Sequence, residues 1–368
     1  MHPQTAAVTA GALPLRLDAS RTCYLYAAIA SSIMATLGHV AWLEERTLET
    51  RGWYNDHGQA YTDLPRLGEY RDVLTEELFR QHEIPDSESA AELIVESIRA
   101  GRYLTVFLDR SQLGPFFGRQ SPSFPHEILI FGVDADRKMV DSVDYDAAGR
   151  LAICRYPLEA VAAAMPDVQS LSAPGDVLYV AQALLPGEPP VPRDVTRATA
   201  AVQSFAEAAV VQPGAVQWWQ PADLHPVQDA EYLYGCDVID QRLFLDDAFS
   251  NADMHLQNVQ LVLEQVVACR KLIARYIGAA SCPVLAAHDQ VVQEMRALKM
   301  SVLAYRLKGL RLRNDPRPDQ WKAAVQRSCA HFVEVVESAA GSDAAALARS
   351  HALSCRPGVA GQDVRGGA

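Results

Sequence analysis

Three residues of the sequence have the chemical types and local settings that a catalytic thiol needs. Cys23 ends the polar stretch LDASRTC and stands at the first turn of a helix-like pattern. Unpaired backbone N–H groups and the helix dipole lower the pKa of a thiol at such a position and favour the reactive thiolate. His126 begins a strand-like segment after a Gly-, Pro- and Ser-rich loop, and Asp141 follows fifteen positions later. We interpret the three residues as nucleophile, general base and orienting carboxylate.

A predicted hairpin brings the histidine and the carboxylate together. Asp134–Asp136 is typical of a tight turn between two strand-like segments. Across such a hairpin His126 and Asp141 would lie side by side, near the ends of the two strands. The carboxylate would then hold one nitrogen of the imidazole ring while the other nitrogen faces Cys23.

Each of these residues also has a purely structural interpretation. Cys23 would be a small buried side chain of an apolar helix, His126 a surface cap and Asp141 a turn residue. Asp144 and Asp146 are alternatives to Asp141 for the orienting role. They fall in the turn-like stretch DYDAAG, where we expect them to be solvated.

Other kinds of site find little support in the sequence. It contains no G-x-x-x-x-G-K-[ST], no G-x-G-x-x-G after a strand and no G-x-S-x-G. His126 and Glu127 begin like the zinc motif H-E-x-x-H, but the second histidine is missing. These absences argue against nucleotide, dinucleotide, serine-hydrolase and zinc-peptidase chemistry, so we expect no metal and no organic cofactor.

Composition excludes further classes of partner and location. A formal net charge of -12 argues against a protein that holds nucleic acid by general electrostatics. No apolar run approaches the ~20 residues that cross a bilayer, and the first residues lack a secretory signal pattern. The seven cysteines are scattered and form no C-x-x-C pair, which is typical of reduced thiols. We therefore expect a cytoplasmic protein without nucleic-acid or membrane partners.

The elements that would position the three residues follow a helix-then-strand order. Apolar residues at helical spacing predict a helix from Leu25 to Leu37, closed by Gly38. Helical patterns follow at Tyr70–His82 and Ser87–Ala100, the latter opened by Asp86 or Ser87. Short β-rich runs then predict an antiparallel sheet, and hence an α+β fold. The predicted strands are Tyr103–Leu108, Glu127–Val133, Lys138–Val143, Leu151–Tyr156 and Asp176–Leu184.

The second half of the chain has a different pattern. Residues 185–193 (LPGEPPVPR) form a proline-rich connector that predicts a domain boundary. We expect a thiol domain over residues 1–185, a mainly α-helical domain over 194–340 and a disordered tail over 341–368. Three long amphipathic patterns predict the helices of the second domain, around Val259–Ile277, Val291–Tyr305 and Trp321–Val336.

The order of these features carries a resemblance to a known family. A cysteine at the start of a long helix, two helical segments, a strand, H-x-x-x-x-x-G-V-D at His126–Asp134 and the following D-S resemble the papain-like fold of bacteriocin leader peptidases. The pattern is more similar still to the N-terminal domain of the butirosin biosynthesis protein H family. The resemblance covers roughly residues 15–185.

The resemblance implies a papain-like thiol domain that transfers acyl or aminoacyl groups in natural-product biosynthesis. In that family the cysteine accepts an acyl group from a carrier-protein thioester and passes it to an amine. Carried over to this chain, Cys23 would be acylated, His126 would act as base and acid, and Asp141 would orient it. The Cys23 N–H would be one oxyanion donor. The partners would be an acyl or peptidyl carrier protein and a small-molecule amine or hydroxyl acceptor.

The chain departs from the family patterns at two places. Papain-like peptidases have a Gln about six residues before the cysteine, where this chain has Leu15-Arg16-Leu17. Butirosin-type proteins have a small or acidic residue directly after the cysteine, where this chain has Tyr24. The missing Gln counts against an efficient peptidase and less against transfer from an activated thioester, whose lower barrier asks less of the oxyanion hole.

Two other functions stay open. The same triad would serve a cysteine peptidase or amidase, and a catalytically silent protein of this fold would serve as a scaffold or binding partner. A basic stretch is a candidate docking face for an acidic carrier protein, although such a stretch is also typical of a solvated helix face. Its residues are Lys299, Arg306, Lys308, Arg311, Arg313 and Arg317.

Overall fold

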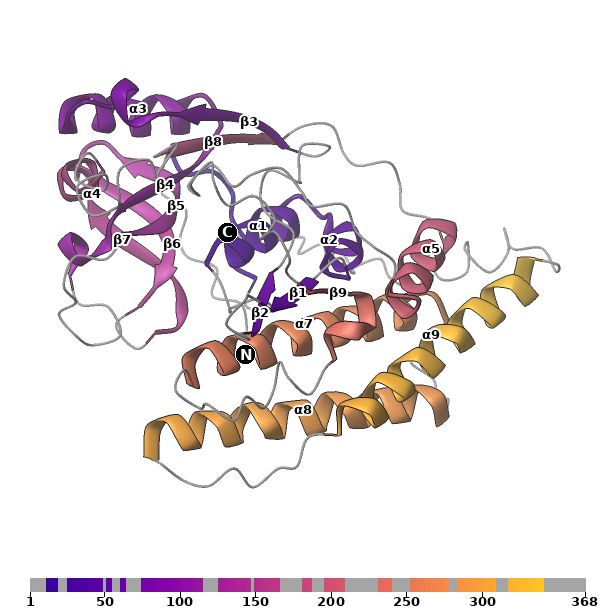
Figure 1. Cartoon of the computed structure of the whole chain (residues 1–368). Coiled ribbons are helices and arrows are strands. Elements are labelled where there is room, and N and C mark those ends of the chain that lie inside the picture. The colour runs from indigo at the N-terminus through magenta and orange to yellow at the C-terminus, as the bar shows by residue number, and fades with distance from the viewer. Residues whose placement is uncertain are drawn as a thin grey trace, which may run out of the picture.

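The computed structural model shows a mixed fold of helices and antiparallel sheet, which confirms the predicted α+β class (Figure 1). Figure 1 shows the larger sheet on one side and the long C-terminal helices on the other. The structure describes residues 11–18, 25–48, 51–54, 60–63, 74–114, 125–146, 149–165, 181–186, 195–208, 231–239, 252–277, 283–308 and 317–340.

The larger sheet within these residues has six strands in the order β3-β8-β4-β5-β6-β7, and every neighbouring pair is antiparallel. Four strands form a meander of neighbours in the sequence, which is the arrangement that short connections favour. Each of the five predicted strands overlaps a strand of this sheet, although residues 176–180 of the predicted strand Asp176–Leu184 lie outside the described residues. The strands are β3 (Leu74–Phe79), β4 (Tyr103–Asp109), β5 (Pro125–Asp134), β6 (Met139–Tyr145), β7 (Leu151–Pro157) and β8 (Ala181–Pro186).

One predicted helix is wrong. Part of the range Tyr70–His82 forms strand β3, which pairs along its whole length with β8 at the edge of the sheet. Leu74 and Leu78 are four positions apart, a spacing that fits one face of a helix and one face of a strand equally well. Tertiary pairing with β8 decided between the two.

Helices cover both faces of this sheet. On one face α1 (Leu25–Thr36) and α2 (Val40–Thr47) share a hydrophobic cluster with Leu129 and Phe131 of β5. On the other face α3 (Ser87–Arg99) and α4 (Leu158–Ala164) share a second cluster with Ile128 and Ile130. Alternate residues of one strand thus face opposite helix layers, as strand geometry requires.

The two predicted N-terminal helices that are confirmed have clear ends. α1 is followed by Gly38, whose φ of +81° is a left-handed conformation that glycine adopts without strain. The Asp86 carboxylate caps α3 by accepting a hydrogen bond from the Ser89 N–H at 2.9 Å. Asp86, and not Ser87, is therefore the N-cap.

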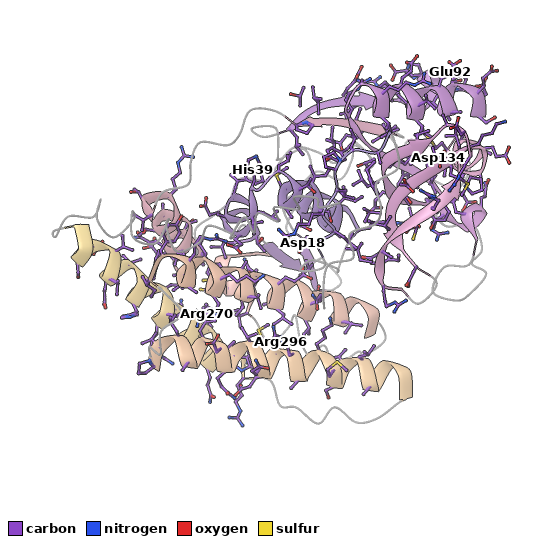
Figure 2. All side chains as sticks on the ribbon, turned by 180° about the vertical axis from the view of Figure 1, so that it is seen from behind. Asp18, His39, Glu92, Asp134, Arg270 and Arg296 are labelled. Carbon is purple, nitrogen blue, oxygen red and sulfur yellow. The ribbon has the colours of Figure 1, made fainter. Side chains whose placement is uncertain are left out.

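The three long helices predicted for the C-terminal half are confirmed. Apolar residues of α7 (Ala252–Ile277), α8 (Pro283–Lys308) and α9 (Pro318–Ala340) form one buried cluster with α5 (Val195–Ala206). Figure 2 labels Arg270 of α7 and Arg296 of α8 on this region. Arg270 donates to the Asp289 carboxylate of α8 at 3.0 Å.

Contacts join the N-terminal and C-terminal parts of the chain. Strand β1 (Arg51–Tyr54) pairs with both β2 (Ala60–Asp63) and the distant β9 (Glu231–Tyr234), which is followed by the 3₁₀ turn η5 (Gly235–Val238). α2 packs against α7, where Arg275 donates to the Glu44 carboxylate at 2.7 Å. The domain boundary at residues 185–193 stays a prediction, and these contacts cross it. The predicted tail, 341–368, lies outside the described residues.

Candidate functional site

The predicted nucleophile, Cys23, lies outside the described residues. Helix α1 begins two positions later in the sequence, at Leu25. Leu25 is fully buried in the cluster that also contains Tyr145 of β6. The first turn of α1 is thus packed within the layer on this face of the sheet.

His126 is the second residue of β5 and lies opposite Leu108 of β4. Its Nδ1 is 2.9 Å from the carbonyl oxygen of Glu127. Because a carbonyl can only accept a hydrogen bond, Nδ1 must carry the proton in this contact. In the neutral ring the lone pair therefore lies on Nε2, which is the nitrogen able to act as a base.

Among the described residues, the side chains of Glu127 and Tyr145 lie near the His126 ring. The Glu127 carboxylate comes within 3.8 Å of Nδ1, and the Tyr145 ring lies edge-on to the imidazole at a centroid distance of 6.5 Å. Side chains alternate between the two faces of a strand, so the His126 side chain leaves β5 on the same face as Ile128. Its ring nevertheless lies beside Tyr145, which belongs to the cluster on the α1 face. The ring thus lies at the end of the sheet, where the two faces meet.

The structure does not bring Asp141 to His126, so the predicted register is wrong. Asp141 lies opposite Gly132, six residues along β5 from His126, which corresponds to about 20 Å of strand. Its carboxylate accepts a hydrogen bond from Arg155 Nε of β7 at 2.8 Å. Asp141 is therefore half of a cross-strand ion pair near the hairpin turn.

Turn length explains the error. The pair Asp134–Met139 closes a loop of residues 135–138, in which Lys138 has a left-handed φ of 54°. A register irregularity between Ile130 and Gly132 then shifts the pairing again. The loop alone would place His126 opposite position 147, and the irregularity moves the pairing back by one residue, so the longer loop accounts for the displacement of β6 from the tight turn expected at Asp134–Asp136.

Asp146 is the carboxylate that this register carries toward His126. Leu129 pairs with Val143. Counting three residues back along β5 and three forward along β6 places Asp146, directly after the end of β6, opposite His126. The Asp146 carboxylate accepts hydrogen bonds from Arg150 Nε at 2.9 Å and Nη2 at 2.7 Å. It stands five residues beyond Asp141, at the place where the sequence predicted an orienting group.

Asp144 is fully buried, contrary to the solvated position that we expected. Its Oδ2 accepts from Arg110 Nε at 2.6 Å and from the Tyr156 hydroxyl at 2.7 Å. Burial and the adjacent Asp144 carboxylate raise the pKa of Tyr156, so the phenol keeps its proton and donates it. Arg110 belongs to the 3₁₀ turn η3 (Arg110–Leu113), and its Nη2 donates to the same hydroxyl at 2.9 Å.

The sequence interpretation missed Glu127, Arg110 and Tyr156. The only available signal was polarity inside apolar runs, since Glu127 opens the strand EILIFGV and Arg110 directly follows YLTVFLD. Neither spacing nor residue type indicated that Arg110 and Asp144 would meet, because they come from segments 34 positions apart.

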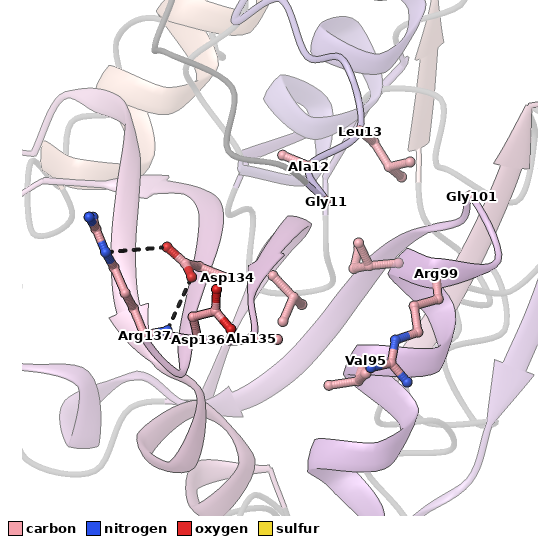
Figure 3. A pocket seen from close by; sticks show the side chains of 12 residues that line it. Gly11, Ala12, Leu13, Val95, Arg99, Gly101, Asp134, Ala135, Asp136 and Arg137 are labelled. Carbon is pink, nitrogen blue, oxygen red and sulfur yellow. Dashed lines mark hydrogen bonds and ion pairs between the residues drawn. The ribbon is translucent and has the colours of Figure 1, made fainter.

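A pocket of about 690 Å³ lies at the opposite end of β5 from His126 (Figure 3). Residues 11–13, the end of α3 and the β5–β6 turn line it, with Arg99 on one side and Asp134 and Arg137 on the other. Arg137 donates its backbone N–H to the Asp134 carboxylate at 3.1 Å. Because it adjoins the hairpin turn, this pocket is remote from the histidine.

Within the described ranges, no group of three or more His, Cys, Asp or Glu side chains could hold a metal ion. None of the helices described combines the length and the apolar character that a membrane span requires.

Comparison of the sequence with protein-family models finds no match, and comparison with curated proteins finds none either.

Proposed function

We propose that the chain is a cysteine-dependent acyltransferase with a papain-like thiol domain. It takes an acyl or aminoacyl group from a carrier-protein thioester and passes it to an amine or hydroxyl acceptor in natural-product biosynthesis. The observation that supports this proposal best is the tautomer of the His126 ring. Its Nδ1 donates to the Glu127 carbonyl at 2.9 Å, which assigns the basic lone pair to Nε2 at the end of the sheet.

The proposed reaction has two halves. In the first, His126 Nε2 takes the proton of Cys23, and the thiolate attacks the thioester carbonyl. The Cys23 backbone N–H donates to the oxyanion, the thioester C–S bond breaks, and the phosphopantetheine thiol leaves with the proton from His126. In the second half, the acceptor attacks the acyl-cysteine while His126 takes the acceptor's proton and returns it to the Cys23 sulfur.

The orienting role belongs to Glu127 in this proposal, and Asp141 has none. The Glu127 carbonyl fixes the tautomer by accepting the Nδ1–H, and the Glu127 carboxylate lies 3.8 Å from the same nitrogen. A backbone carbonyl, like a carboxylate, can set the tautomer of a catalytic histidine, because either one accepts a hydrogen bond from the ring N–H.

The proposed partner is an acidic carrier protein, and the proposed location is the cytoplasm. Of the basic stretch predicted to dock it, Lys299 donates from α8 to the Gln260 side chain of α7. The side chains from Arg306 to Arg313 lie outside the described residues. Docking through this stretch stays a prediction.

The test is intact-protein mass spectrometry after incubation with acylated carrier proteins. We expect one added acyl mass that peptide mapping places on Cys23, and none in Cys23→Ala. Cleavage of peptide amides without a carrier protein would instead show a peptidase or amidase. A Cys23 that stays unmodified with all acyl donors while the protein binds a carrier protein would favour a scaffold.

A further inference from the structure

We propose that the buried network of Arg110, Asp144 and Tyr156 positions the His126 ring, with Asp144 acting through Tyr145. This inference rests on the proposed role of His126 as the base. None of the three network residues touches the reacting atoms, so they are positioning residues. Their influence on His126 is argued from three observations.

The first observation is that the network joins the turn η3 to strands β6 and β7 through a charge pair that is shielded from water. Asp144 is 0% exposed and Arg110 is 2% exposed, and they form an ion pair of 2.6 Å. The Tyr156 hydroxyl donates to Asp144 and accepts from Arg110, so both polar ends of the pair are satisfied. A buried ion pair whose polar groups are all hydrogen-bonded holds its side chains in place, because any movement of one of them leaves a buried charge without compensation.

The second observation links Asp144 to the histidine. Asp144 Oδ1 accepts the backbone N–H of Tyr145 at 2.6 Å. The Tyr145 ring lies edge-on to the His126 imidazole, at 6.5 Å between centroids and an interplanar angle of 66°. The carboxylate thereby holds the residue against which the imidazole packs, and this contact limits how far the ring can rotate away from the Glu127 carbonyl.

The third observation is a second route, through the turn after β4. Asp109 pairs with Pro125, the residue directly before His126, and the Asp109 carboxylate caps η3 by accepting from the Ser111 N–H at 3.0 Å. Arg110 follows at once and donates from Nη1 to the Gly114 carbonyl at 3.2 Å. The network therefore fixes the turn that borders the start of β5 on the side of β4.

The test reads the tautomer of His126 directly, by ¹⁵N NMR of the full chain with labelled histidine. The wild type should show the proton on Nδ1. Asp144→Asn and Tyr145→Leu should each raise the Nε2-protonated fraction, whereas the control Asp141→Asn should not. Tyr145→Leu leaves the ion pair in place, so it tests the coupling even where Asp144→Asn folds poorly. An unchanged tautomer in a folded Tyr145→Leu variant would overturn the proposal.

A second measurement is single-turnover acylation of Cys23 in the same variants. Misplacing a catalytic group by about 1 Å costs about 10²-fold, so we expect losses of this order in Asp144→Asn and Tyr145→Leu. The double variant should lose no more than the worse single variant, because the two residues act in series. Additive losses would contradict that. Altered tautomers in a chain whose Cys23 is never acylated would refute the proposed function and leave the positioning intact.

Discussion

Replacing Asp144 by Asn is the most informative single change in this protein. The substitution keeps the size of the side chain, so it creates no cavity. Asp144 uses both oxygens as acceptors, Oδ1 for the Tyr145 N–H and Oδ2 for Arg110 and Tyr156. Asn has only one acceptor end, so its NH₂ group must face a donor on one side.

The magnitude follows from burial. Removing one partner of a buried ion pair leaves the other charge uncompensated and costs about 3–5 kcal/mol. Asp141→Asn in the same strand is a matched control, because its partner Arg155 has a side chain 36% exposed to water. Loss of such a pair costs about 0–1 kcal/mol. We expect the two variants to differ by about 3 kcal/mol in the free energy of unfolding.

Urea unfolding followed by circular dichroism measures this difference. With a urea dependence of about 1–3 kcal/mol per molar, the Asp144→Asn midpoint should fall by about 1 M or more and that of Asp141→Asn by much less. Equal midpoints would show that the Arg110–Asp144 pair carries no more stability than a surface pair. A larger loss in Asp141→Asn would refute the argument that the buried partner Arg110 makes Asp144 the more costly carboxylate of β6 to replace.

Three further predictions concern other parts of the chain. Iodoacetamide should label Cys23 before Cys236, because burial raises the pKa of the Cys236 thiol to about 11. Peptide mapping that finds Cys236 labelled first would contradict the assignment of Cys23 as the nucleophile. A chain ending near residue 186 should keep Cys23 reactivity and lose most transfer activity. It should also melt at a lower temperature, because it lacks the Arg275 that binds Glu44. An unchanged melting temperature would show that the contacts between the two halves of the chain do not stabilise the N-terminal half. Burial lowers the pKa of His288 from 6.5 to about 4. Between these two pH values, His288 therefore binds a proton when the protein unfolds. The stability should therefore be complete above pH 6.5 and fall by roughly 3 kcal/mol toward pH 4, and His288→Gln should flatten that part of the pH profile measured by urea titration.

Much of the secondary structure could be predicted from local patterns. Helix α1 and its closing Gly38, the Asp86 cap of α3 and the strands β4 to β7 all follow from periodicity and capping chemistry. These signals act over one or two turns of chain, so neighbouring residues contain them. The range Tyr70–His82 failed because Leu74 and Leu78 fit both periods, and only pairing with β8 distinguishes them.

The candidate site could be predicted only in part. The sequence by itself determined that His126 begins a strand and that a hairpin follows, because turn residues and β-rich runs are local features. It did not determine which carboxylate approaches the histidine. A loop of residues 135–138 in place of the expected tight turn moved that place from Asp141 toward position 147, and one irregularity in the ladder brought it back to Asp146.

The burial of charge was decided by tertiary structure alone. The sequence led us to expect a solvated Asp144, and only the packing of η3, β6 and β7 places it beside Arg110 away from water. The physical reason is that a charge can be buried only where a partner from another segment compensates it. Such compensation depends on contacts between residues far apart in the chain, which no local pattern contains.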